Sequence, residues 1–238
     1  MDDILKSVLD SYSPSESTKK LVKSVQTVLL VGISGAGKNT ITSHLLKTGK
    51  FHLIISHTTR FPRKNHGVME KDGVEYHFVS HQKIYDMLIK GEFVEAKKYT
   101  SNVYGTSVNE FLKAAKENKH AIADIEVQGV AEYMSISPET VKPIFLLPPN
   151  FKTWQERFYA RYEGITGKSG MHERMQAAIE ELQHLLHHTY FSIVVNDNLM
   201  EAVTQVQSIV NGEIQSDAAQ RYGQKIAHEL LNDMKKEL

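Results

Sequence analysis

The chain has 238 residues, of which 41% are hydrophobic and 24% charged, so it can bury a core and is not disordered in bulk. The 28 basic and 28 acidic residues cancel, so no net positive charge predicts nucleic acid or a membrane surface as a partner, and we expect neither. Cysteine is absent, which excludes disulfides and thiolate metal sites and fits a cytoplasmic location. No apolar run reaches 18 residues, so we expect no membrane-spanning segment.

The N-terminal part predicts an accessory segment, a strand and a helix. Apolar side chains recur at helical spacing in residues 2–11, and SPSES then breaks the pattern, so we expect a short helix and a linker. The run VQTVLLV (25–31) predicts a buried parallel strand. The glycine-rich segment VGISGAGKNT (31–40) follows, and NTITSHLLKTG predicts a helix that ends at Gly49.

The rest of the chain alternates strands with helices. Residues 57–107 interrupt this alternation, because they are rich in Arg, Lys, Gly and Tyr and predict an inserted subdomain. The alternation itself predicts an α/β fold, with a parallel sheet flanked by helices. The expected strands are 51–56, 120–126, 141–149 and 191–197; the expected helices are 81–90, 151–160, 171–188, 199–210 and 217–238; and 162–170 is a glycine-rich connection.

Gly32, Gly37 and Lys38 fit the pattern G-x-x-x-x-G-K of a phosphate-binding loop. Glycines let successive N–H groups point into one anion-sized hollow, and the following helix adds its positive N-terminal end. The lysine supplies a point charge to the β- and γ-phosphates. Because a strand precedes the loop and a helix follows it, we expect an ATP site formed by Gly32, Ser34, Gly35, Ala36, Gly37, Lys38, Asn39 and Thr40.

Asparagine stands at position 39, where a serine or threonine hydroxyl usually helps to hold magnesium. The carbonyl oxygen of Asn39 is also a hard ligand, and magnesium keeps several waters, so contact through water would suffice. Thr40 is less well placed, because its side chain points about 100° further around the helix. We expect Mg²⁺ with ATP near Asn39 and Asp124, the latter at the end of the strand 120–126.

A second group of polar residues lies in the inserted segment. Arg60 and Arg63 stand three apart around a proline turn and can converge on one phosphate, since a guanidinium fork matches phosphate oxygens. The hydroxyls of Tyr76 and Tyr104 could complete this cradle, and Glu95 adds a carboxylate. Each residue alone also fits a solvated arginine or a packed tyrosine, so the group, and not any one member, indicates a site.

From about residue 25 to residue 210 the chain resembles the guanylate kinases, through the segments GISGAGK, ISHTTRFPR, DGVEYHFVS, GEFVEA, VYGTS, ADIEVQGV, FLLPP and VVND. The resemblance implies a P-loop core, an inserted subdomain that binds the nucleoside monophosphate, and a mobile lid. It also implies transfer of the γ-phosphoryl group of MgATP to GMP and dGMP. The implied bounds are 1–24 and 211–238 for the terminal extensions, 56–107 for the monophosphate subdomain, 157–171 for the lid, and 25–55, 108–156 and 172–210 for the core.

The resemblance further implies how guanine is read. A carboxylate such as Glu95 accepts from the N1 and N2 donors of guanine, and hydroxyls of Ser56 and Thr106 can donate to O6. Adenine would leave the carboxylate unpaired, and unmatched buried hydrogen bonds discriminate strongly. The implied GMP-binding residues are Ser56, Arg60, Arg63, Tyr76, Glu95, Tyr104, Thr106, Asp124 and Glu126.

Positions in the lid region carry the implied catalytic charges. Arg157, Arg161 and Arg174 match the family's lid arginines, and with Lys38 they would neutralise charge on the transferring phosphoryl group. Asn196 matches a loop that lies near adenine. No general base is needed, because the second pKa of a phosphate monoester is about 6 and its oxygen is already ionised at neutral pH.

Departures from the family leave two alternatives open. Glu126 stands where aspartate is usual, and the turn 64–73 is long, which would fit a monophosphate kinase with another base preference. A catalytically inactive member that binds proteins is the other alternative, which the presence of Lys38 and Arg157 disfavours. His184 and His188 have a zinc-compatible spacing, but no third ligand is evident and we expect no zinc site.

Overall fold

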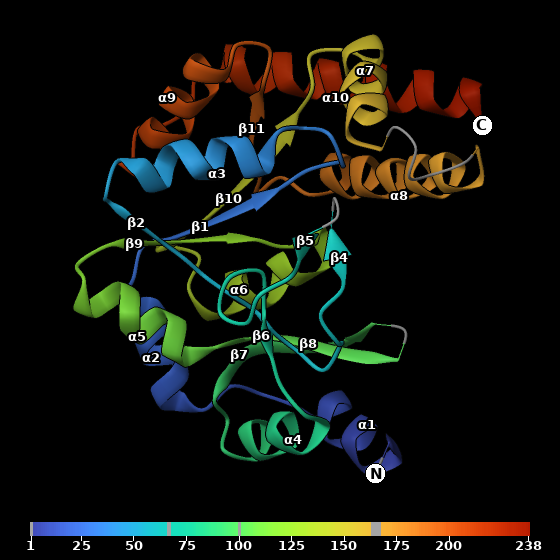
Figure 1. The fold of residues 1–238 in the computed structure, drawn as a ribbon. Helices are drawn as coiled ribbons and strands as arrows, with labels where there is room; N and C mark the ends of the chain where they lie inside the picture. Colours follow the sequence, from blue (N-terminus) through green and yellow to red (C-terminus); the bar gives the residue numbers. More distant parts are fainter. Residues whose placement is uncertain (1, 66–67, 100, 163–167) are drawn as a thin grey trace. The chain divides into compact units, whose positions relative to one another are not determined.

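The computed structural model describes residues 2–65, 68–99, 101–162 and 168–238 (Figure 1). The chain folds into two compact units. The first comprises residues 1–27, 50–123 and 131–141, and the second comprises 28–49, 124–130 and 142–238. Parallel strand pairs and covering helices occur in both, which confirms the expected α/β class with a parallel sheet flanked by helices.

The second unit is built around strands in the order β11-β10-β1. All five positions of β1 (Thr27–Val31) are buried, as its continuous apolar sequence requires of a strand covered on both faces. Strand β10 (Val141–Leu147) runs parallel to β11 (Ser192–Val195), with Ile144 opposite Ser192. The accompanying helices are α3 (Lys38–Lys47), α7 (Phe151–Tyr162), α8 (Lys168–His187), α9 (Leu199–Val210) and α10 (Asp217–Glu237), with a 3₁₀ turn, η1, at Val127–Gly129.

The first unit contains the parallel pair of β2 (Phe51–Leu53) and β9 (His120–Asp124) and a separate four-stranded sheet. That sheet has the order β6-β3-β8-β7, in which β7 (Phe93–Tyr99) is an edge strand antiparallel to β8 (Asn102–Ser107). The other elements are β3 (His57–Thr58), β4 (Lys64–Asn65), β5 (Val68–Met69), β6 (His77–Phe78), α1 (Asp2–Asp10), α2 (Glu16–Lys23), α4 (His81–Ile89), α5 (Val108–Lys116) and α6 (Val130–Ile136).

The expected linker after the first helix is wrong, because α2 occupies most of it. Ser15 is the N-cap of α2, and its hydroxyl accepts from the Thr18 N–H at 3.2 Å. Glu16 follows in the first turn, where a carboxylate favours the helix dipole. Ser15, which lies in the segment SPSES where the pattern predicts a break, therefore starts a helix, as N-cap serines commonly do.

The C-terminal segment covers the free edge of β11. Gln220 accepts from the Ile193 N–H at 3.2 Å and donates to the Phe191 carbonyl at 2.9 Å, while Gln215 donates to the Ile193 carbonyl at 2.6 Å. Gly223 lets α10 approach the strand, since a Cβ there would lie 2.5 Å from the Ile193 side chain. Two glutamine amides thus satisfy backbone groups that an edge strand otherwise leaves open.

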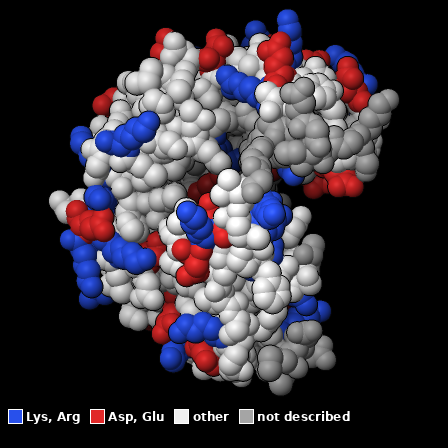
Figure 2. Space-filling model, viewed as in Figure 1, with Lys and Arg blue, Asp and Glu red and all other residues white. Residues whose placement is uncertain are grey.

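Charge is distributed evenly on the face shown in Figure 2, where basic and acidic side chains are interspersed. This agrees with the formal net charge of zero. Within the described residues, no helix combines the length and the apolar character that crossing a bilayer would take.

Removing the Gln220 amide should destabilise the second unit. We expect Gln220→Ala to lower the free energy of unfolding by about 1–3 kcal/mol, because it leaves an N–H and a carbonyl of the β11 edge without partners. Urea unfolding followed by circular dichroism measures this. Gln224→Ala, at an exposed position one turn later on α10, is the matched control, and an equal loss in both variants would contradict the edge role of Gln220.

Candidate functional site

The glycine-rich loop between β1 and α3 leaves the N-terminus of α3 open. Gly37 is the N-cap, with φ of 97°, and no side chain caps the first turn. The first N–H groups of a helix have no partner inside the helix, so an uncapped end can receive an anion. Lys38 begins the helix, and Asn39 and Thr40 are exposed in its first turn.

Asn196 fastens this loop to the end of β11. Its side-chain N–H donates to the Ala36 carbonyl at 2.8 Å, and its own backbone N–H donates to the Leu147 carbonyl at 2.7 Å. A Cβ on Gly37 would collide with the Asn196 amide, so the close approach requires glycine there as much as the positive φ does. The side chain of Asn196 thus lies against the loop backbone, and its expected place near adenine stays a prediction.

Helix α7 packs on the other part of the loop. The Trp154 indole N–H donates to the Ser34 carbonyl at 2.8 Å, and the Arg157 Cβ lies 3.8 Å from a Cβ built on Gly35. One guanidinium nitrogen of Arg157 donates to the Asn196 carbonyl at 3.0 Å. The other terminal nitrogen, Nη1, is buried and has no hydrogen-bond partner among the described residues.

The structure describes only part of the remaining lid residues. Arg161 lies in the last turn of α7, but its side chain is outside the described residues, as are residues 163–167 of the expected lid. Arg174 lies in α8. Their expected contact with a phosphoryl group therefore stays a prediction.

Lys38 faces carboxylates as well as the loop. Its ammonium donates to the Gly32 carbonyl and lies 3.9 Å from Oδ1 of Asp124. Glu181 on α8 belongs to the same group, because burial raises its pKa to about 7 while the Lys38 charge opposes that rise and the charges of Glu126 and Asp124 add to it. Oε2 of Glu181 is buried and unpaired among the described residues.

Sequence reasoning missed Glu181, although a signal exists. Ala178, Leu182 and Leu185 form a buried stripe on α8, and Glu181 stands at a position adjoining that stripe. A carboxylate on the apolar side of an amphipathic helix is unusual enough to be noticed.

In the first unit, Glu70 holds the two arginines of the proline turn. An Arg60 terminal nitrogen lies 2.9 Å from one Glu70 oxygen and 3.1 Å from the other. The Arg63 N–H donates to Glu70 at 3.0 Å, and its Nε lies 3.6 Å from the same carboxylate. Burial raises the pKa of Glu70, but the Arg63 N–H and Arg60 outweigh it and hold the pKa below its ordinary value. Sequence reasoning missed Glu70 because the long turn displaces it.

Two tyrosines extend this cluster. The rings of Tyr76 and Tyr104 meet edge to face with centroids 5.8 Å apart, and the Arg60 guanidinium lies 5.4 Å from the centre of the Tyr76 ring. Tyr104 also interacts with Arg60 and helps to raise the pKa of the guanidinium. Arg60, Tyr76 and Tyr104 are thus brought together as expected, whereas the Arg63 side chain is 71% exposed and joins them only through Glu70.

The residues expected to read guanine also meet in the first unit. Glu95 on β7 is opposite Thr106 on β8 and hydrogen-bonds it, and the Thr106 hydroxyl lies 3.4 Å from that of Ser56. Burial raises the pKa of Glu95 to about 7, against the opposing effect of Thr106 and Lys97. The fully buried Tyr133, which the sequence did not indicate, interacts with the charge of Glu95.

Two residues that were expected to bind GMP are not in the same unit as Glu95. Asp124 and Glu126 both belong to the second unit, where they share the surroundings of Lys38 and Glu181. Both are exposed. Their expected contact with the monophosphate stays a prediction.

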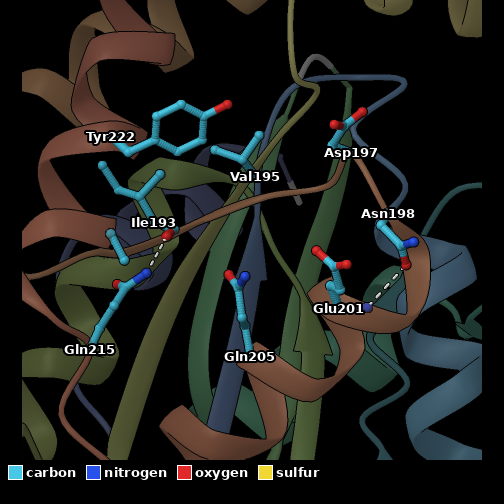
Figure 3. Close-up of a pocket in the computed structure, with 9 residues that line it drawn as sticks. Ile193, Val195, Asp197, Asn198, Glu201, Gln205, Gln215 and Tyr222 are labelled. Carbon is cyan, nitrogen blue, oxygen red and sulfur yellow. Dashed lines mark hydrogen bonds between the residues drawn. The ribbon is translucent and has the colours of Figure 1, made fainter.

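Beside Asn196, the second unit has a pocket of about 220 Å³ formed by β11, α9 and α10 (Figure 3). Asp197, Glu201, Gln205, Gln215 and Tyr222 contribute polar groups to its lining. Asp197 lines the pocket, whereas its neighbour Asn196 is not among the lining residues. The carboxylates of Asp197 and Glu201 would repel a phosphate, and we assign the pocket no part in phosphate binding.

Two histidines at the C-terminal end of α8, His184 inside the helix and His188 directly after it, pair with each other. The rings of His184 and His188 stack with centroids 4.0 Å apart, and His184 Nε2 lies 3.2 Å from the Tyr190 hydroxyl. Within the part of the chain that the structure describes, no three His, Cys, Asp or Glu side chains form a group that could hold a metal ion.

Comparison with known proteins gives one consistent result. The sequence model of the guanylate kinase family matches residues 24–213. The chain is 33% identical to a guanylate kinase of Schizosaccharomyces pombe, over 83% of this chain and 96% of that one, and 32% identical to one of Clostridioides difficile, over 81% and 90%. A solved guanylate kinase of Anaplasma phagocytophilum shares the fold, with a TM-score of 0.57, 23% identity, and coverage of 82% of this chain and 88% of that one.

The contact of Gly37 with Asn196 can be tested. We expect Gly37→Ala to weaken binding of a fluorescent ATP analogue about 10-fold or more, because the methyl group adds a collision to the cost of positive φ. Gly49→Ala is the matched control: φ there is 72°, but a Cβ meets nothing within 4 Å. If both variants bound the analogue equally well, the collision would not matter.

Proposed function

Because the chain belongs to the guanylate kinase family, we propose that it transfers the γ-phosphoryl group of ATP to GMP, and to dGMP, giving ADP and the nucleoside diphosphate. It is an ATP-dependent nucleoside monophosphate kinase. The observation that carries the base assignment is the half-buried Glu95, paired with Thr106, whose hydroxyl lies 3.4 Å from that of Ser56, in the unit that also holds the arginine–tyrosine cluster. A cytoplasmic location stays a prediction from the cysteine-free composition.

We assign the donor phosphates to the loop before α3. The uncapped helix end offers N–H donors, and Lys38 offers a charge that can leave the Gly32 carbonyl for a phosphate oxygen. Arg157 is held against the loop through the Asn196 carbonyl and keeps a buried nitrogen without a partner. In this proposal it donates to the phosphoryl group, where charge spreads in the transition state.

The acceptor phosphate is assigned to Arg60, Arg63, Tyr76 and Tyr104. Glu70 holds the Arg60 guanidinium and the backbone of Arg63 before any substrate arrives, which lowers the entropy that binding would otherwise cost. The remaining donors of Arg60 and the two phenol groups can then turn to the monophosphate. No side chain has to remove a proton, because the phosphate oxygen that attacks is ionised at neutral pH.

Selectivity for guanine is assigned to Glu95, with Ser56 and Thr106. An ionised Glu95 accepts from both donors on the pairing edge of guanine, whereas adenine would leave it without a match. Burial raises the pKa of Glu95 to about 7, so ionisation of the carboxylate near neutral pH costs little free energy. A ligand that donates hydrogen bonds to the ionised form therefore stabilises it. No observation favours another base or a catalytically inactive, protein-binding role.

Magnesium is the cofactor we propose with ATP. The Asp124 carboxylate, 44% exposed and 3.9 Å from the Lys38 ammonium, and the Asn39 amide oxygen are the hard ligands near the loop, directly or through water. Bound with the nucleotide, the ion supplies charge neutralisation at the β- and γ-phosphates. Asp124 would also keep Lys38 oriented while that happens.

The proposed reaction is tested by measuring ADP formation with GMP, AMP, CMP and UMP in turn. We expect GMP to be strongly preferred, and Lys38→Met to lower turnover with GMP about 100-fold or more, because a charge that acts on the transferring phosphate is lost. Lys47→Met, at an exposed position on the same helix, serves as the control and should keep native rates. Absence of turnover with all four acceptors would overturn the assignment.

The protonation of Glu95 should be visible in the pH dependence. Since its pKa is raised to about 7 and guanine pairs with the ionised form, KM for GMP should rise about 10-fold between pH 8 and pH 6. In Glu95→Gln only the titration of the monophosphate itself, with pKa of about 6, should remain. Superimposable pH profiles of KM in the two proteins would exclude Glu95 as the titrating group.

A further inference from the structure

The N-terminal helices lie before the segment that matches the family, which begins at residue 24, yet they pack on the sheet that carries Glu95. Helix α1 contacts α4 and β7. Leu5 is 5% exposed and joins a buried cluster with Ile84, Leu88 and Phe93. The extension is therefore part of the packed core of the first unit.

Tyr12, two residues after α1, makes the most specific contact. Its hydroxyl donates to the Phe93 carbonyl at 2.6 Å and accepts from the Phe93 N–H at 2.8 Å. One hydroxyl thus binds both backbone groups of a single residue on the edge strand β7. Burial raises the pKa of Tyr12 to about 12, so the hydroxyl keeps the proton that it donates.

The contact of Tyr12 with Phe93 lies at an irregular part of β7. The pairing of β7 with β8 shifts register between Phe93 and Glu95. A bulge leaves the backbone partly unpaired and redirects the side chains beyond it. The direction of the Glu95 carboxylate therefore depends on how this irregular segment is held, and Tyr12 binds its first residue.

A second attachment precedes the bulge. The Thr18 hydroxyl donates to the Gly91 carbonyl at 2.8 Å, and the Ser15 N–H donates to the same oxygen at 3.4 Å. Gly91 has φ of 65°, and a Cβ there would lie 2.9 Å from the Ser15 side chain. The extension thus holds the chain at Gly91 and again at Phe93, directly before Glu95.

We propose that the N-terminal extension sets base selectivity, with Tyr12 as a positioning residue that fixes the bulged start of β7 and so orients Glu95 toward guanine. This inference rests on the proposed function. Tyr12 bonds to Phe93 and acts on the substrate only through the strand. Loss of its hydroxyl should therefore affect recognition of GMP and leave the ATP side unchanged.

The test is Tyr12→Phe, which removes both hydrogen bonds and keeps the ring that packs in the core cluster. We expect KM for GMP to rise about 5-fold and the preference for GMP over AMP to fall by a similar factor, while kcat and KM for ATP stay at native values. Tyr85→Phe is the control, because Tyr85 is a half-buried tyrosine of the same cluster, and no hydrogen bond joins its hydroxyl to β7 among the described residues.

A double-mutant cycle separates positioning from general loss of stability. If Tyr12 acts through Glu95, the change Tyr12→Phe should alter KM for GMP by less than about 2-fold when Glu95→Gln is already present. A 5-fold effect that persists in the Glu95→Gln protein would overturn the proposal. So would an unchanged KM in Tyr12→Phe, or an equal change in Tyr85→Phe.

The two levels of failure are distinct. A native protein that forms no ADP with GMP refutes the proposed function, whereas a native protein that phosphorylates GMP and is indifferent to Tyr12→Phe refutes the positioning role alone. If the native protein forms no ADP, the affinity for GMP can still be measured by calorimetry. Equal affinities of the native and Tyr12→Phe proteins would then overturn the inference.

Discussion

The Asn196 side chain joins the end of β11 to the phosphate loop, 160 residues earlier in the chain, by donating to the buried Ala36 carbonyl. The geometry of the loop depends on this bond, because it brings the amide so close to Gly37 that a Cβ there would collide with it unless the Asn196 side chain moved. The same residue's carbonyl accepts from Arg157, so one asparagine fixes both the loop and the arginine beside it. A hydrogen bond is stronger where both partners are buried, and it limits which side chains can stand at the positions that contact it.

A related constraint acts at the sheet edges. Each edge strand presents N–H and carbonyl groups that need partners. Gln215 and Gln220 supply them for β11, and Tyr12 supplies them for β7. Both sets of side chains belong to segments outside residues 24–213, which match the family. The two extensions thus supply hydrogen-bond partners to the edge strands that they cover. In the first unit the covered strand, β7, carries Glu95 of the proposed base site.

The sequence was enough to predict the α/β class, the loop and the grouping of Arg60, Tyr76 and Tyr104, because each rests on local pattern or on a matched motif. The second N-terminal helix is not predicted by the sequence pattern, since a proline–serine segment usually indicates a break, although Ser15 is a good N-cap. Glu70 and Tyr133 were missed for two other reasons. The long turn displaces Glu70, although the arginines that it binds are near it in the sequence. Tyr133 interacts with the charge of Glu95, which lies far away in the chain, and neither periodicity nor spacing records such a contact.

Four carboxylates, of which Glu70 and Glu110 are buried and Glu95 and Glu181 half-buried, divide into two kinds according to whether hydrogen bonds and cations outweigh burial in setting the pKa. Glu70 and Glu110 each accept a backbone N–H and face at least one cationic side chain, so their pKa values fall below the ordinary range despite burial. At Glu95 the hydrogen bonds from Thr106 and the charge of Lys97 do not outweigh burial, and at Glu181 the charge of Lys38 does not outweigh it either, so the pKa of each is raised to about 7. The first kind is already compensated and holds structure together. The second kind lies, one in each unit, beside the residues assigned to guanine and to the donor phosphates. A ligand that donates hydrogen bonds to such a carboxylate, or a cation bound beside it, would stabilise the ionised form and lower the pKa of the carboxylate.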